Sequence, residues 1–118
     1  MKNKARALLS TFALASLGLS AAAQADCPFP KAPATIPDGA TATEAEMLAA
    51  MKEFKAYNEE VKAFQACLDE EAKAKGAGAQ SMTFKSMQQK KLAAAVDELE
   101  RKAKLFNEQV RIFKARSS

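Results

Sequence analysis

The chain has 118 residues, of which 48% are hydrophobic and 7% aromatic, and it contains neither Trp nor His. This length allows one domain, and without histidine most hydrolytic and metal chemistry lacks its usual participant. Of the 18 basic residues, three (Lys2, Lys4 and Arg6) lie in the leader described next. The other 15 oppose 14 acidic residues, so the net charge of +1 argues against a general affinity for nucleic acid.

Residues 1–25 have the three parts of a secretion signal. The cationic start precedes an apolar run from Ala7 to Leu19, and Ala23-Gln24-Ala25 is a small-residue cleavage motif. The run is too short to span a bilayer, and no later stretch is apolar enough to do so. We therefore expect cleavage after Ala25 and a periplasmic or secreted protein. A buried N-terminal helix and lipidation of Cys27 are the alternatives.

The chain has two cysteines, Cys27 and Cys67. An even number in an oxidising compartment favours an intramolecular disulfide. Two free thiols, or a bridge to another chain, are the alternatives that the count leaves open.

All four prolines lie in residues 26–42, which we expect to form an extended strap ending in a turn at Pro37-Asp38-Gly39. If a helix starts at Thr43, Cys67 lies about 36 Å along its axis. The sixteen steps from Cys27 to Thr43 cover about 50 Å of extended chain. The strap can therefore run back along the helix and reach Cys67.

Two long helices are expected over residues 43–75 and 81–115, within a hairpin of residues 43–116. Thr43 and Glu46 have the spacing of a capping box, and glycines at positions 76 and 78 end the first helix. Apolar or small residues alternate at intervals of three and four, the heptad pattern of a coiled coil. In the two segments they are Met47, Ala50, Phe54, Tyr57, Val61, Phe64 and Leu68, then Leu92, Val96, Leu99, Ala103, Phe106, Val110 and Phe113.

The predicted fold is all-α: a long antiparallel two-helix coiled-coil hairpin with an extended Pro-rich N-terminal strap. Folding back at the glycines pairs positions whose numbers sum to about 157. In that register Phe54 faces Ala103 and Phe106 faces Ala50, so large side chains meet small ones.

No residue pattern indicates catalysis, a bound cofactor or a resident metal, and we expect no enzyme. Tyr57 lies on the core stripe, and Cys67 has no neighbouring base. The acidic run at Asp69 is typical of a solvated helix face rather than a calcium loop. Methionines on a helix face are more often packing than copper ligands.

Some apolar side chains fall beside the main stripe and need cover. The strap, an envelope protein, or a second copy in a homodimer are the candidates for covering them. Near the open end of the hairpin they form a candidate interaction patch of Leu48, Met51, Leu105 and Ile112, and near the hinge they are Met82, Phe84 and Met87.

Ile36-Pro37-Asp38-Gly39, followed by Glu46-Met47 and combined with the two cysteines, resembles a family of small exported proteobacterial proteins of uncharacterised function. The resemblance implies export and a helical hairpin, and it implies no catalytic residue or ligand. We therefore expect a periplasmic hairpin that acts by contact, as a structural or protein-interaction module of the cell envelope. A holdase-like chaperone is the alternative, and a metal-ion carrier a less favoured one.

Overall fold

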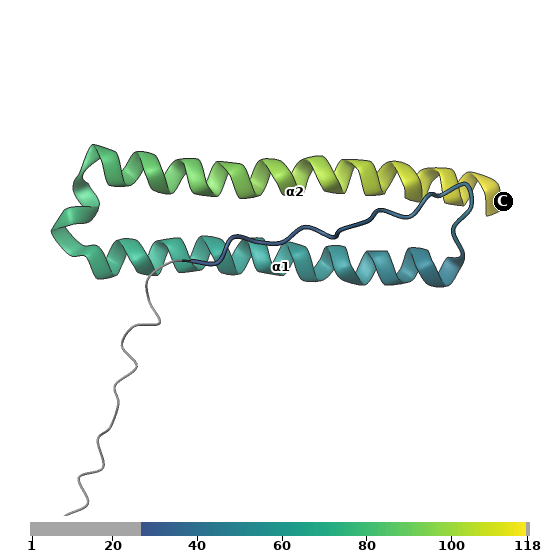
Figure 1. The fold of residues 1–118 in the computed structure, drawn as a ribbon, viewed down its shortest axis with the longest axis horizontal. Helices are drawn as coiled ribbons and strands as arrows, with labels where there is room; N and C mark the ends of the chain where they lie inside the picture. Colours follow the sequence, from purple (N-terminus) through teal and green to yellow (C-terminus); the bar gives the residue numbers. More distant parts are fainter. Residues whose placement is uncertain (1–26, 118) are drawn as a thin grey trace, which may run out of the picture.

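The computed structural model describes residues 27–117, which form two long antiparallel helices and an extended N-terminal strap (Figure 1). Helix α1 spans Glu44–Lys75, a short 3-10 turn η2 spans Gly76–Gln80, and helix α2 spans Met82–Ser117. The predicted hairpin is confirmed. The predicted signal sequence and its cleavage site lie outside the described residues.

Local signals fix where the helices begin and end. The Thr43 hydroxyl accepts a hydrogen bond from the Glu46 amide at 3.2 Å, and the Glu46 carboxylate accepts one from the Thr43 amide at 2.7 Å. This reciprocal pair is the predicted capping box. Gly76 ends α1 with a φ of 61°, a conformation that costs glycine little. Ser81 then caps α2, because its hydroxyl accepts from the Phe84 amide at 3.1 Å.

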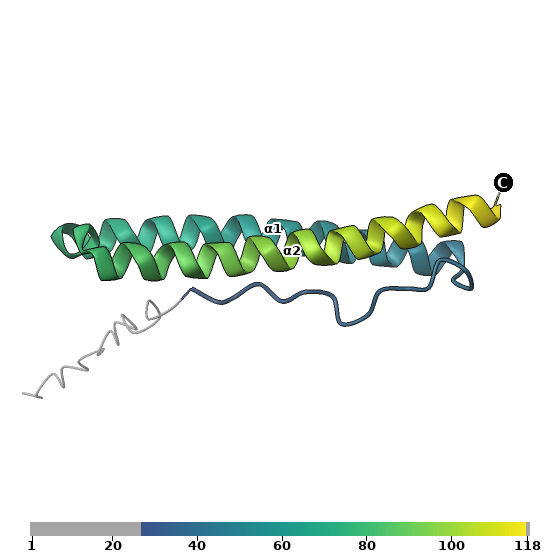
Figure 2. The same ribbon diagram turned by 90° about the horizontal axis from the view of Figure 1, so that it is seen from above.

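The strap, residues 27–42, runs back along the hairpin in extended conformation (Figure 1) and lies on one side of the helix pair (Figure 2). Its first residue, Cys27, is bonded to Cys67 of α1, with 5.8 Å between the two Cα atoms. The predicted intramolecular disulfide is confirmed, and the alternatives of free thiols or a bridge to another chain are wrong.

The core follows the predicted stripe closely on α1 and only in part on α2. All seven stripe residues of α1 are buried, whereas on α2 Phe106 alone is buried and the other six are half-buried. The strap explains the difference. It lies along α1 from Pro28 to Thr35 and hydrogen-bonds α2 only at its far end. The stripe of α1 is therefore covered by two elements, and that of α2 mainly by one.

The helices pair in a register three residues away from the predicted one. The ring of Phe54 stacks on that of Phe106 with 4.7 Å between centroids, so facing positions sum to 160. In an antiparallel coiled coil the a positions of one helix meet the d positions of the other, and this register satisfies that rule along the whole stripe. The helix ends that flank the turn, Lys75 and Met82, still sum to the predicted 157, so the length of the turn does not account for this shift.

The stacked rings should carry much of the stability. We expect Phe54→Ala or Phe106→Ala to lower the free energy of unfolding by about 3–5 kcal/mol, because each change removes a large buried ring. Urea denaturation of the oxidised protein measures it. Glu59→Ala is the control and should cost less than about 0.5 kcal/mol, because its ion pair with Lys62 is exposed. Equal losses in all three variants would contradict the packing described here.

Candidate interaction surfaces

The strap contacts one flank of the hairpin, which can be named by its heptad position. With the core stripe at positions a and d, the strap-contacting residues Glu60, Cys67, Gln109 and Arg116 all occupy position g. The opposite flank, formed by the e positions, carries no strap. Its residues are mostly polar, and they are Met51, Asn58, Gln65 and Ala72 on α1, and Ala93, Glu100, Asn107 and Lys114 on α2.

Near the open end of the hairpin the strap is fixed by hydrogen bonds to α2. The Gly39 amide donates to the Gln109 side chain at 2.8 Å. The Arg116 guanidinium donates to the carbonyl oxygens of Ala40 at 2.7 Å and Ala42 at 2.6 Å. The sequence analysis did not predict this anchor, because nothing local to Arg116 indicates a partner more than 70 residues away.

Gly39 sits where the strap backbone approaches α2 most tightly. A Cβ atom on this residue would lie 2.1 Å from the Gln109 carbonyl oxygen and 3.0 Å from the Phe113 amide nitrogen. These are backbone atoms of a helix and cannot move aside cheaply. The close approach therefore requires glycine, the last residue of the Ile36-Pro37-Asp38-Gly39 motif.

Gly39→Ala should displace the strap turn and lower the free energy of unfolding by about 1–3 kcal/mol. Gly78→Ala is the matched control, since a Cβ there would meet only the flexible side chain of Lys75, at 3.1 Å or more. Thermal or urea unfolding compares them. If the two variants lose stability equally, the docking of the strap on α2 is not as described.

Tyr57 is the most deeply buried large side chain and lies where the strap crosses α1. It is 1% exposed and borders a small surface hollow with Pro33 and Ala34 of the strap. Its hydroxyl has no hydrogen-bond partner among residues 27–117. Burial raises the pKa of the Tyr57 hydroxyl, and the nearby Glu98 carboxylate raises it further.

Tyr57→Phe should therefore stabilise the protein, by up to about 1 kcal/mol, because it removes a buried polar group that gains no partner. A pKa raised in the folded state contributes stability that is lost as pH rises above the ordinary tyrosine value of 10.0. Urea unfolding at neutral and alkaline pH should show that the natural protein loses free energy of unfolding above that value. Tyr57→Phe should reduce this loss. A destabilised phenylalanine variant would mean that the hydroxyl has a partner.

The four residues predicted as one interaction patch lie on two different flanks. Leu48 and Met51 are on the b and e positions of α1, on the flank without the strap, and are 48% and 40% exposed. Leu105 is 44% exposed and borders the strap at Ile36, and the half-buried Ile112 shares its c position on α2. They do not form a continuous surface, so the patch that suggested a homodimer is divided.

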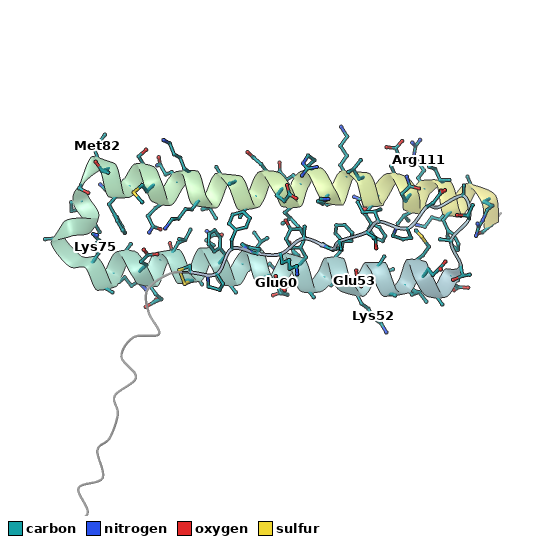
Figure 3. The ribbon with its side chains drawn as sticks, viewed as in Figure 1. Lys52, Glu53, Glu60, Lys75, Met82 and Arg111 are labelled. Atoms are coloured by element: carbon teal, nitrogen blue, oxygen red, sulfur yellow. A yellow bond between two sulfur atoms is a disulfide. The ribbon has the colours of Figure 1, made fainter. Side chains whose placement is uncertain are left out.

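The turn end of the hairpin, which we call the apex and define as residues 69–91, lies beyond the core. The last buried contacts are those of Leu68 with Leu92 and Ala95. Beyond them α2 presents Lys85, Gln88 and Gln89 toward α1, around an open cleft of about 340 Å³. Figure 3 shows Lys75 and Met82 at this end. The apex is therefore held mainly by helix formation and its caps.

Apolar side chains of the apex are exposed. Met82 is 83% and Met87 is 51% exposed, the first of these being the most exposed large apolar side chain among the described residues. Phe84 is half-buried, with the Lys75 ammonium 5.0 Å from its ring centroid. The sequence predicted that these three residues need cover, and neither the strap nor the helices supply it for the methionines.

In the acidic run at residues 69–71, one carboxylate is paired with a lysine of the next turn of α1. Glu70 pairs with Lys73 at 2.9 Å, and this hydrogen bond raises the pKa of Lys73. The Glu71 carboxylate lies 3.6 Å from the Cys27 sulfur. Within residues 27–117 no group of three or more metal-binding side chains is brought together. No helix in the same part of the chain could cross a bilayer.

Comparison with known proteins returned no matching family model, curated sequence or solved structure. The resemblance to an exported family therefore rests on the sequence motif and the cysteines alone.

Proposed function

We propose that this protein is exported and acts in the cell envelope as an interaction module, with the apex as its contact surface. The observation that carries the proposal is the difference between the two ends. From Ala42 to Leu68 and from Leu92 to Phe113, apolar side chains pack between the helices and the strap. At the apex, Met82 and Met87 project into solvent.

Such exposure is unfavourable at about 25 cal/mol per Å² of apolar surface unless a partner covers it. The disulfide supports the localisation, because such bonds persist in oxidising compartments such as the periplasm. The predicted signal sequence supports it independently.

The proposal is tested by photo-crosslinking in cells. A photoreactive residue replaces Met82 in one variant and Lys52 in a control variant. The Lys52 side chain is on the far side of α1 from the strap (Figure 3). We expect envelope components to be captured at position 82 and not at position 52, and the protein to fractionate with the periplasm. Cytoplasmic fractionation, or equal capture at the two positions, would contradict the proposal.

Holdase-like binding of unfolded proteins is the second candidate function. The exposed methionines favour it, because flexible thioether side chains adapt to partners of different shape. If it is correct, the protein should suppress aggregation of a reduced or heated client, and Met82→Asp with Met87→Asp should abolish the effect. A natural protein that leaves client aggregation unchanged would contradict this function.

A further inference from the structure

The apex combines an uncharged end with a ring of lysines. Residues 76–84, which contain η2 and the start of α2, carry no charged side chain. On either side of them, residues 72–96 contain no acidic residue and five lysines. These lysines, which we call the collar, are Lys73, Lys75, Lys85, Lys90 and Lys91. The apex also contains the acidic run of residues 69–71, in which Glu70 pairs with Lys73. Beyond that run all of its charge is positive, and it surrounds an uncharged end in a way that matches a negatively charged surface.

We propose that the apex docks end-on at the surface of a bilayer containing anionic phospholipid. Met82, Met87 and the Gly76–Gln80 turn would enter the headgroup region, and the collar lysines would contact the phosphates. The proposal rests on the proposed function, in which the apex is the contact surface, and it names the chemistry of the partner.

The geometry of α2 suits this arrangement. Lys85 lies about 4–5 Å, and Lys91 about 13 Å, along the helix axis from Met82. Apolar faces of interfacial helices enter the headgroup and acyl boundary by about 5–10 Å. The nearer lysines then lie at phosphate depth, and the flexible stems of Lys90 and Lys91 let their ammonium groups reach toward it.

The choice of cation favours lipid over protein. Every basic residue between positions 72 and 96 is a lysine. The arginines of the described chain, Arg101, Arg111 and Arg116, lie toward the other end of α2. Protein interfaces are enriched in Arg and depleted in Lys, whereas an anionic lipid surface attracts either cation through its charge.

The backbone of the apex limits how deeply it can enter. The Gly76 amide bonds to the Lys73 carbonyl and the Ser81 amide to the Gly78 carbonyl, while the polar side chains of Gln80 and Ser81 remain exposed. Unpaired polar groups are costly in hydrocarbon. The structure therefore places the contact among the headgroups, with release by salt.

Vesicle flotation tests the proposal with the oxidised chain from Asp26 onward, which contains every described element. Vesicles of phosphatidylcholine with phosphatidylglycerol should bind the protein at least tenfold more strongly than phosphatidylcholine alone, and high salt should release it. Lys85→Glu with Lys90→Glu should weaken binding by more than tenfold, at about fivefold for each lysine lost. The charge-matched control, Lys52→Glu with Lys104→Glu, should retain most of the binding.

A single tryptophan reports which part of the molecule enters the membrane, since the natural chain has none. With phosphatidylglycerol vesicles the fluorescence of Met82→Trp should shift to the blue, and that of Met51→Trp on α1 should not. Both substitutions fall on exposed side chains, so the fold is expected to tolerate them.

Absence of binding to the anionic vesicles, equal losses in the two lysine variants, or a blue shift at position 51 alone would overturn the proposal. Capture of a protein at position 82 in cells without any vesicle binding would overturn it too, while leaving the proposed interaction module in place. Capture of nothing at position 82 would instead count against the proposed function itself.

Discussion

The position of one disulfide on one flank determines how this small protein is built. A pair of helices buries a single seam, which gives a thin core for a chain of this size. Because Cys67 is at a g position, its bond to Cys27 commits the strap to the g flank of both helices. There the strap completes the burial of Tyr57, Phe64 and Ala95. The e flank has no strap, and its amides and charges are interrupted by the exposed Met51.

The same constraint divides the described chain into a part that the strap covers and an apex that the strap does not reach. From the strap turn to the disulfide, three elements share a core, and the Arg116 and Gln109 anchors close the end of the hairpin. Past Cys67 none of the described strap residues lies along the helices, and α2 turns polar side chains such as Lys85 and Gln89 toward α1. The apex therefore lacks the cover of the strap, and it carries Met82, the most exposed large apolar side chain among the described residues. Adaptable contact surfaces are commonly found in such regions.

Local patterns predicted the elements well, and long-range pairing was where they failed. The capping box, the heptad stripe of α1 and the reach of the strap each depend on a few neighbouring residues or on a length, so they could be derived before the fold was known. The helix register could not, because it is seen in the stacking of Phe54 on Phe106, two residues far apart in the sequence. The burial of Ala95 and the division of the patch between Met51 and Leu105 depend on which flank the strap takes. The g position of Cys67 was the signal that could have fixed this flank.

Amide hydrogen exchange of the oxidised and reduced protein tests most directly whether the bonded strap supplies the missing layer of core. Closing the loop between the cysteines contributes about 4 kcal/mol on the chain-entropy model. Reduction should therefore sharply lower protection from Met47 to Leu68, and should change little at the apex, which should exchange fastest among the helical segments in both states. Unchanged protection of α1 after reduction, or an apex protected as strongly as the core, would contradict this role of the strap.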